Sequence, residues 1–247
     1  YSVVVFDPDN KSPAGKIANK HICRPYDDLE ALDELKAICS SVTTEFENIP
    51  ADTLQYLEKD IIVRPSSKAI SIAQNRIKEK DFLGKFGVPV GQYIVIDSIK
   101  SISNINEEHK IFPGILKTAQ FGYDGKGQLH VNNIVELENA FISFNNVPCV
   151  LELKLELDLE FSIVLARSVN GEYLEYPLIE NHHESGILDF SLIPARVPFL
   201  LKKEATKLAM KIANNLSYIG VMAVEFFISD NHLYVNEIAP RPHNSGH

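Results

Sequence analysis

Two apolar segments near the end of the chain, 221–228 and 233–238, each carry one carboxylate among hydrophobic residues, Glu225 and Glu237. The short polar stretch between them predicts an antiparallel hairpin. A three-residue loop at 230–232 would place Glu225 directly opposite Glu237, on one face of the strand pair. Strand alternation adds to that face Val221, Ala223, Phe227, Val235 and Ala239. Facing like charges need compensation, so we expect a divalent cation at Glu225 and Glu237. The alternatives are two solvent-exposed glutamates, or a register difference of one residue that separates them.

A glycine-rich segment, 120–128, connects two further predicted strands, 113–119 and 129–131. Its glycines at 122, 125 and 127 allow backbone amides to approach a phosphate closely. It is not a Walker A loop, because no Gly-Lys-Ser/Thr sequence opens a helix after it. Lys117, in the apolar strand before the segment, is costly to bury without an anion. We predict a flap over bound phosphate; an ordinary glycine-rich hairpin and a solvent-facing lysine are the alternatives.

The order of predicted elements indicates two kinds of domain. Over the first 65 residues, strands at 3–6, 41–46 and 61–63 alternate with helices at 27–40 and 51–59, which is typical of a parallel α/β sheet. A long helix at 68–86 leads into a second domain. That domain has predicted strands at 92–96, 149–153, 160–168 and 173–179, and helices near 103–110, 134–144 and 198–216.

Composition excludes several classes of protein. The formal net charge of −9 disfavours a nucleic-acid partner, which needs clustered Lys and Arg, but still allows a small anionic substrate. No apolar run approaches the roughly 18 residues of a membrane helix, and no leader pattern opens the chain, so we expect a cytoplasmic protein without a membrane partner. Cys23, Cys39 and Cys149 have no metal-ligand spacing and are expected to be reduced, half-buried and structural.

The two ends of the chain predict a truncated protein. Residue 1 is Tyr and the chain opens inside a predicted strand, while the last nine residues are rich in functional residue types and close no element. The Gly-rich turn that a dinucleotide-binding fold requires after its first strand does not occur in the N-terminal part, which disfavours binding of a nicotinamide cofactor.

Two segments resemble the signatures of the N5-carboxyaminoimidazole ribonucleotide synthetases: FGYDGKGQ at 121–128 and NEIAPRPHNSGH at 236–247. The resemblance extends to 43–50, 73–76 and 180–188, and so covers essentially the whole chain. It implies an α/β (α+β) protein with an ATP-grasp fold, preceded by a Rossmann-like parallel α/β domain that lacks its first strand. We expect domains at 1–72 and 73–247, a lid subdomain at about 97–150, and no C-terminal domain.

The same resemblance implies ATP and Mg²⁺ as cofactors, with Mn²⁺ as an alternative metal. The implied phosphate ligands are Arg76, Lys117, Gly122, Tyr123, Asp124, Gly125, Lys126, Gly127 and Gln128. Those around adenine and ribose are Glu152, Leu153, Lys154, Leu155, Glu160 and His183. Asn236 would lie beside the metal ligands Glu225 and Glu237. Arg241, His243 and Asn244 would face bicarbonate and 5-aminoimidazole ribonucleotide, forming the catalytic set with Lys117.

The implied activity is carboxylation of 5-aminoimidazole ribonucleotide by ATP and bicarbonate through carboxyphosphate, a step of purine synthesis, in a homodimer. Two rivals stay open: an ATP-grasp ligase that uses formate and glycinamide ribonucleotide, against which the tail at 241–247 argues, and a non-catalytic nucleotide-binding module.

Several individual residues also have two interpretations. His182 and His183 are either site or surface residues, and Glu45 and Glu47 either meet a substrate or end a solvated strand. Asn75 stands where the family usually has Asp, which predicts a looser hold on Arg76.

Overall fold

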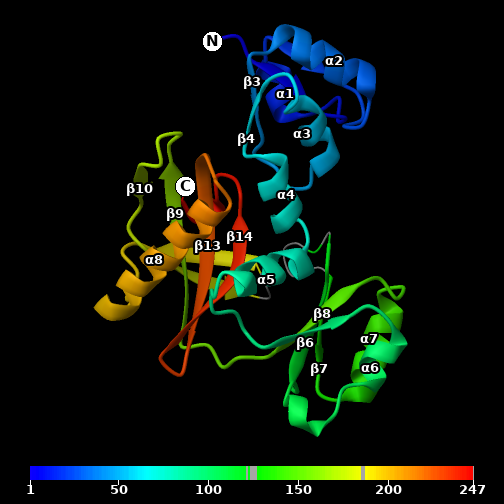
Figure 1. Ribbon diagram of the computed structural model, residues 1–247, viewed down its shortest axis with the longest axis vertical. Coiled ribbons are helices and arrows are strands. Elements are labelled where there is room, and N and C mark those ends of the chain that lie inside the picture. The colour runs from blue at the N-terminus through cyan, green and yellow to red at the C-terminus, as the bar shows by residue number, and fades with distance from the viewer. Residues whose placement is uncertain (121, 123–126, 185–186, 247) are drawn as a thin grey trace.

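The computed structural model describes residues 1–120, 122, 127–184 and 187–246, and within them the strands form four sheets (Figure 1). Two small parallel pairs lie in the N-terminal part, a four-stranded antiparallel sheet follows, and a six-stranded antiparallel sheet ends the chain. No helix in the described part of the chain is long and apolar enough to cross a membrane.

The N-terminal part has the predicted α/β rhythm. Its elements are β1 (Val4–Phe6), α1 (Pro13–Ile17), β2 (Lys20–Ile22), α2 (Leu29–Ile38), β3 (Ser41–Thr43), α3 (Ala51–Leu57), β4 (Ile62–Arg64) and α4 (Ser67–Ala73). β1 pairs with β2 and β3 with β4, both in parallel, and the helices bury Leu32, Leu54 and Leu57 against them. β3 ends at Thr43, three residues earlier than predicted. Cys23 is exposed rather than half-buried, while Cys39 is half-buried and Cys149 buried; all three are free.

The helix predicted over 68–86 is two helices, α4 and α5 (Arg76–Lys85). Asn75 interrupts it with an extended backbone, and its side-chain Oδ1 accepts from the amides of Ile77 at 3.0 Å and Lys78 at 3.1 Å. An asparagine that caps the following turn competes with the helical hydrogen bond, so the break needs no proline or glycine. It turns α5 toward the middle of the molecule (Figure 1).

The four-stranded sheet has the order β5 (Tyr93–Ile96), β8 (Cys149–Leu153), β6 (Gly114–Thr118), β7 (Gln128–Val131). The helices α6 (Ile99–Ser103) and α7 (Ile134–Ser143) cover one face, where Leu116 and Leu151 are buried (Figure 1). The helix predicted near 103–110 is instead α6 followed by a short 3-10 turn, η1 (Glu107–His109). Because side chains alternate along a strand, Ile115 and Lys117 of β6 point to the uncovered face.

The six-stranded sheet has the order β12-β11-β9-β13-β14, with β10 paired to β9. Its strands are β9 (Leu159–Arg167), β10 (Tyr173–Glu175), β11 (Ile179–Glu184), β12 (Ile187–Leu192), β13 (Gly220–Ser229) and β14 (His232–Ala239). The strand predicted at 173–179 is thus divided between β10 and β11. Helix α8 (Phe199–Asn215) packs on one face against Met222, Val224 and Phe226. The opposite face carries the carboxylates of β13 and β14, and η2 (Asn244–Gly246) lies at its edge.

The hairpin of β13 and β14 confirms the facing glutamates but not the loop from which they were predicted. Ser229 pairs with His232 around a two-residue turn, Asp230-Asn231, and both turn residues have a positive φ, at 50° and 59°. Left-handed residues at both positions are typical of a type I′ turn. A β-bulge at Asn236 then shifts the register by one residue, so Phe226 pairs with Val235 and Glu225 with Glu237.

The bulge corrects one further prediction. Val235 was expected on the face of the two glutamates, but it packs in the main core with Phe226 and Ile238. A shift of one residue in register moves a side chain to the opposite face, because the side-chain repeat of a strand is two residues.

Candidate active site

A cavity of about 470 Å³ lies between the uncovered face of the four-stranded sheet and the carboxylate face of the six-stranded sheet. Helix α5 and the segment after β3 complete its wall. The charged and polar side chains that line it are Glu47, Asn48, Gln74, Arg76, Glu79, Lys80, Lys117, Gln120, Gln128, Glu152, Glu160, His183, Glu225, Asn236, Glu237, Arg241, His243 and Asn244. The cavity therefore collects most of the residues that the sequence singled out.

Two lysines share one carboxylate at the cationic end of the cavity. Lys117 Nζ lies 2.9 Å from Glu152 Oε2, and Lys80 Nζ lies 3.2 Å from Glu152 Oε1. All three side chains are buried, so Lys117 does not face solvent. Burial acts to raise the pKa of Glu152, but the ammonium groups of Lys117 and Lys80 outweigh it and hold the pKa at about 2. One anion between two cations leaves a net positive charge, which suits a phosphate ligand.

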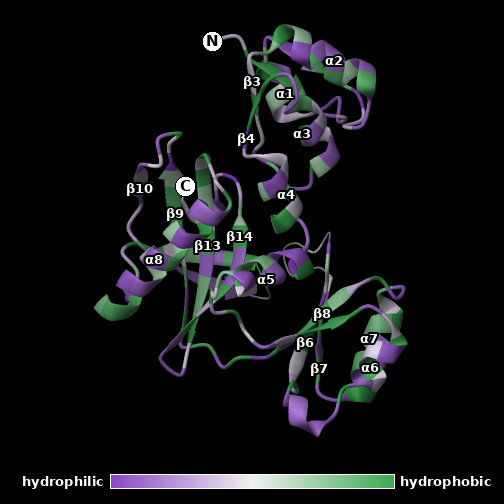
Figure 2. Cartoon of the chain, viewed as in Figure 1, coloured by the Kyte–Doolittle hydropathy of each residue, from purple (hydrophilic) through white to green (hydrophobic). Residues whose placement is uncertain are grey.

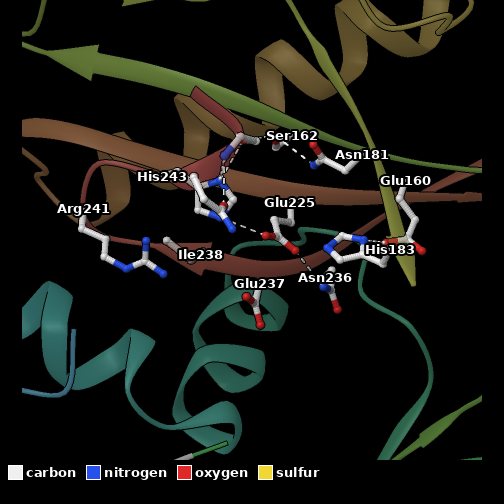
Figure 3. A network of polar contacts seen from close by, with 12 residues as sticks. Glu160, Ser162, Asn181, His183, Glu225, Asn236, Glu237, Ile238, Arg241 and His243 are labelled. Atoms are coloured by element: carbon white, nitrogen blue, oxygen red, sulfur yellow. Dashed lines mark hydrogen bonds and ion pairs between the residues drawn. The ribbon is translucent and has the colours of Figure 1, made fainter. Parts of the chain in front are cut away.

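Two glutamates occupy the other wall. Glu225 Oε1 lies 3.0 Å from Nε2 of His243, and Glu225 Oε2 accepts from Asn236 Nδ2 at 3.2 Å (Figure 3). Glu237 has a weaker partner, Arg76, whose Nη1 lies 3.2 Å from Glu237 Oε2. Burial acts to raise the pKa of Glu225, but the bond from His243 prevails and the pKa is lowered. Burial and the charge of Glu225 raise the pKa of Glu237, so the negative charge of the pair is incompletely compensated.

This donor set fits a hard divalent cation. Carboxylate oxygens, with an amide oxygen beside them, are the ligands that Mg²⁺ prefers, and the metal usually needs only one or two protein carboxylates when substrate phosphates supply other ligands. The described residues contain no cluster of three or more His, Cys, Asp or Glu that would enclose a metal alone. The residues present therefore match an open magnesium site and not a closed structural one.

Helix α5 supplies two site residues that the sequence interpretation missed, Glu79 and Lys80. The helix is largely hydrophilic (Figure 2), yet these two side chains are only 2% exposed. Glu79 Oε1 accepts from the amide of Ile238 at 2.6 Å. Burial, followed by the charge of Glu237, raises the pKa of Glu79 to about 8. The spacing of Arg76, Glu79 and Lys80, three and four residues apart on one helix face, is the signal that could have identified them.

Asn75 contributes only as the cap of α5, because its side chain bonds the helix amides and Arg76 is held by Glu237. An Asp would occupy the same capping role. The expectation that Asn75 loosens Arg76 therefore has no basis in the contacts of these two residues.

The segment expected around adenine and ribose borders the cavity in most of its positions. Leu153 and Leu155 line it, whereas the side chain of Lys154 is exposed and its amide donates to the carbonyl of Pro113. Glu160 Oε2 lies 2.9 Å from Nδ1 of His183. That bond raises the pKa of His183, against the effect of burial.

The neighbouring histidine, His182, points away from the cavity. Its ring stacks on Phe190 with 4.3 Å between centroids, and its Nε2 contacts Glu180 at 2.8 Å. Strand alternation in β11 separates the two adjacent histidines, so His183 lines the cavity and His182 lies on the opposite side of the strand.

Residues after β14 connect the cavity to the N-terminal part. Arg241 Nε lies 2.9 Å from Glu47 Oε2, and Gln74 Nε2 donates to the carbonyls of Glu47 and Ile49. Glu45 is exposed and makes no such contact. Of the two glutamates predicted to end a strand there, Glu47 alone faces the cavity, and it follows the strand instead of ending it.

The glycine-rich segment is described only at its two ends. Gly122 and Gln128 line the cavity, and Gly127 has a positive φ of 70°, where a Cβ atom would lie 2.7 Å from Thr118 Oγ1. The predicted phosphate ligands Tyr123, Asp124, Gly125 and Lys126 lie outside the described residues.

A nucleotide-sized cavity between a small antiparallel sheet and a larger acidic one, with lysines opposite carboxylates, defines an ATP-grasp protein. Residues 81–247 match the ATP-grasp domain family, and residues 1–74 match the ribonucleotide synthetase preATP-grasp domain family. Over its full length the chain is 36% identical to the N5-carboxyaminoimidazole ribonucleotide synthase of Brucella melitensis, of which it covers 69%. The chain belongs to the N5-carboxyaminoimidazole ribonucleotide synthase family.

Further relatives agree in sequence and in structure. The enzyme of Bacillus subtilis is 39% identical over the whole chain, which spans 65% of that protein's length. Among solved structures, the Staphylococcus aureus N5-carboxyaminoimidazole synthetase complexed with ADP has a TM-score of 0.91 and 38% identity, with 100% of this chain and 66% of that chain covered. The Aspergillus clavatus synthase in complex with ADP and 5-aminoimidazole ribonucleotide has a TM-score of 0.85 and 27% identity, with 98% and 64% covered.

Proposed function

We propose that the protein catalyses the ATP-dependent carboxylation of 5-aminoimidazole ribonucleotide with bicarbonate. The products are N5-carboxyaminoimidazole ribonucleotide, ADP and phosphate. The observation that carries the proposal is one cavity that holds a lysine pair on one wall and a glutamate pair on the other. Cations opposite a carboxylate pair that could hold a metal are typical of phosphoryl-transfer sites, in which catalysis is mostly positioning and charge neutralisation.

In this proposal the nucleotide lies with its phosphates between the two sheets. Arg76, Lys117 and the segment from Gly122 to Gln128 hold the phosphates, with Lys80 adding charge. Backbone groups from Glu152 to Leu155 border adenine, Glu160 binds the ribose hydroxyls, and His183 lies close by. The Staphylococcus and Aspergillus enzymes were both solved as complexes with ADP, which supports a nucleotide site in this chain.

Glu225 and Glu237 would hold Mg²⁺, with Asn236 beside them, and Mn²⁺ is the substitute most similar in its ligands. When bound, the metal would supply positive charge to the oxygens of the transferred phosphoryl group. His243 and Asn236 keep Glu225 ionised and oriented through their bonds to its two oxygens. Arg76 orients one oxygen of Glu237 through its contact of 3.2 Å.

Arg241, His243 and Asn244 would face bicarbonate and the ribonucleotide. Bicarbonate is a poor electrophile, and its phosphorylation to carboxyphosphate converts one oxygen into a good leaving group. The exocyclic amine of the ribonucleotide then attacks the carboxyl carbon, or the CO₂ released from it, and phosphate departs. Arg241, held by Glu47, would orient the bicarbonate for phosphorylation.

Phosphate release with two acceptor amines tests the proposal. We expect turnover that requires bicarbonate and 5-aminoimidazole ribonucleotide together, and none with formate and glycinamide ribonucleotide. Turnover with the second pair would contradict the proposal in favour of the rival ligase. Binding of Mg-ATP in calorimetry without turnover on either pair would indicate a nucleotide-binding module.

A homodimer in the cytoplasm is part of the same proposal, supported by the family, and sedimentation analysis would measure the number of subunits.

A further inference from the structure

A row of polar side chains continues from the glutamate pair across the sheet. Ser162 on β9 pairs with Glu225 on β13 and, on its other side, with Ile179 on β11; Asn181 follows two residues later. Directly paired residues share a face, so Glu237, Glu225, Ser162 and Asn181 lie on the cavity side of the sheet (Figure 3). Ser162 and Asn181 are buried, at 0% and 5% exposed.

These side chains form one continuous chain of hydrogen bonds to Glu225. Asn181 Nδ2 donates to Ser162 Oγ at 3.1 Å, Ser162 Oγ and Ser245 Oγ are 2.7 Å apart, and Ser245 Oγ lies 2.8 Å from His243 Nδ1. Nε2 of the same imidazole lies 3.0 Å from Glu225 Oε1. A buried polar network in which each member has a partner restricts the orientation of all of them.

Starting from the amide at the far end, one direction gives every hydroxyl proton of the chain an acceptor. Asn181 Nδ2 only donates, so Ser162 Oγ accepts from it, and among the contacts of the described residues Ser245 Oγ is the acceptor within reach of the Ser162 proton. Ser245 in turn directs its proton to His243 Nδ1, which must be the unprotonated ring nitrogen. Nε2 then carries a proton, which it donates to Glu225.

Contacts at the other end give the same assignment independently. The backbone amide of Ser245 donates to His243 Nδ1 at 3.4 Å, so this nitrogen is an acceptor for a second donor. Glu225 as a carboxylate only accepts, so the facing Nε2 must donate. Asn181 itself is oriented by Ser191, whose hydroxyl donates to Asn181 Oδ1 at 3.0 Å.

We propose that Asn181, Ser162 and Ser245 are positioning residues that fix His243 as the Nε2–H tautomer and thereby orient Glu225. Outer groups that fix the tautomer and orientation of inner ones typically change metal affinity 10- to 100-fold when removed. The consequence for catalysis rests on the proposed function, whereas the tautomer itself does not. Asn181 belongs to one of the segments that resemble the family, yet it does not line the cavity. The hydrogen-bonded network gives this residue a role.

Nitrogen-15 NMR of the histidines in the ligand-free full chain tests the tautomer directly, because the two ring nitrogens have separate resonances. In the wild type we expect His243 to show an unprotonated Nδ1 and a protonated Nε2. Asn181→Asp replaces the donor by a group that only accepts, so the serine protons turn toward position 181, the hydroxyl donor to Nδ1 is lost, and the Nδ1 resonance should move away from its wild-type value. Asn215→Asp is the matched control, because it makes the same substitution on α8, where Asn215 Nδ2 donates to the carbonyl of Lys211 at 2.8 Å outside the network; the wild-type pattern should persist.

Ser162→Ala separates an effect along the chain from a through-space effect of the new charge. In the Ser162→Ala background, Asn181→Asp should no longer change the His243 resonances, since the connection is cut. An unchanged effect in that background would overturn the proposal, as would a wild-type pattern in Asn181→Asp alone.

Affinity for magnesium-ADP, measured by calorimetry, is the second readout. We expect Asn181→Asp to weaken it about 10-fold or more, with no change in Asn215→Asp. Should Asn181→Asp fail to fold, Ser245→Ala removes the hydroxyl donor to Nδ1. The Nδ1 resonance of His243 in this variant should then move toward that of a ring nitrogen without a hydrogen bond. Wild-type values of both this resonance and the affinity for magnesium-ADP would refute the inference. A tautomer change without carboxylation activity would count against the proposed function alone.

Discussion

Glu152 is the counter-charge of two buried lysines, so its neutralisation is expected to destabilise the nucleotide-free protein. Glu152→Gln keeps the size of the side chain but leaves the ammonium groups of Lys80 and Lys117 without an anion. The pKa of Glu152 is about 2, against an ordinary value of 4.5. At about 1.36 kcal/mol per pKa unit, this difference corresponds to about 3 kcal/mol of stability. Breaking a buried ion pair by removing one partner typically costs about 3–5 kcal/mol, which agrees.

Urea denaturation at pH 7, without nucleotide, measures this loss in the free energy of unfolding. Glu156→Gln is the control, because it removes the same charge from an exposed side chain a few residues away. The folded pKa of Glu152 lies below its unfolded value, so its contribution is complete above pH 4.5 and is lost as the pH falls toward 2. The difference between wild type and Glu152→Gln should therefore shrink below pH 4.5.

Mg-ATP should also narrow that difference, because its phosphates would supply the missing negative charge. A loss below about 1 kcal/mol in Glu152→Gln, or an equal loss in Glu156→Gln, would refute the reasoning.

Three further predictions concern other residues that line the cavity. Glu79 has a folded pKa of about 8, so the folded metal-free protein keeps a proton that the unfolded chain releases; stability should fall as the pH rises from 4.5 to 8, and Glu79→Gln should remove that fall in denaturation curves. Arg241→Ala should reduce bicarbonate-dependent turnover about 100-fold or more while costing less than about 1 kcal/mol of stability, since its pair with Glu47 is partly exposed; a large loss of stability would assign it a structural role. Glu237→Gln should abolish turnover and weaken Mg-ATP binding in calorimetry, and wild-type kinetics would refute the metal assignment.

The facing glutamates could be predicted from the sequence because strand alternation and hairpin pairing are local rules. Glu225 and Glu237 do pair, but through a two-residue turn and a bulge that compensate each other by one residue. Neither the shorter turn nor the bulge alters the apolar pattern of the strands, so the sequence does not reveal them. In the structure, the position of Val235 in the core shows the bulge. The break between α4 and α5 was not predicted for a different reason. Asn75 was considered for the charge that it lacks relative to Asp, and not as a helix cap.

Contacts between distant segments could not be predicted. Lys117 and Glu152 are 35 residues apart, Arg241 and Glu47 are 194 apart, and Ser162 and Ser245 are 83 apart. A lysine in an apolar strand predicts that some anion lies near it. The sequence alone does not show that the anion near Lys117 is the carboxylate of Glu152. The same holds for Glu79, whose burial depends on the packing of α5 against β14 and not on any pattern in the helix itself.

The central claim is that bicarbonate is activated by phosphorylation in the cavity between Lys117 and the glutamate pair. Bicarbonate labelled with oxygen-18 tests it most directly, in a reaction with ATP, magnesium and 5-aminoimidazole ribonucleotide. If carboxyphosphate forms, the oxygen that bridges carbon and phosphorus leaves with phosphorus, so each phosphate released should carry one labelled oxygen. Mass spectrometry of the phosphate reads this out. Turnover that yields unlabelled phosphate would contradict the account, because the phosphoryl group would then have passed to water or to another acceptor.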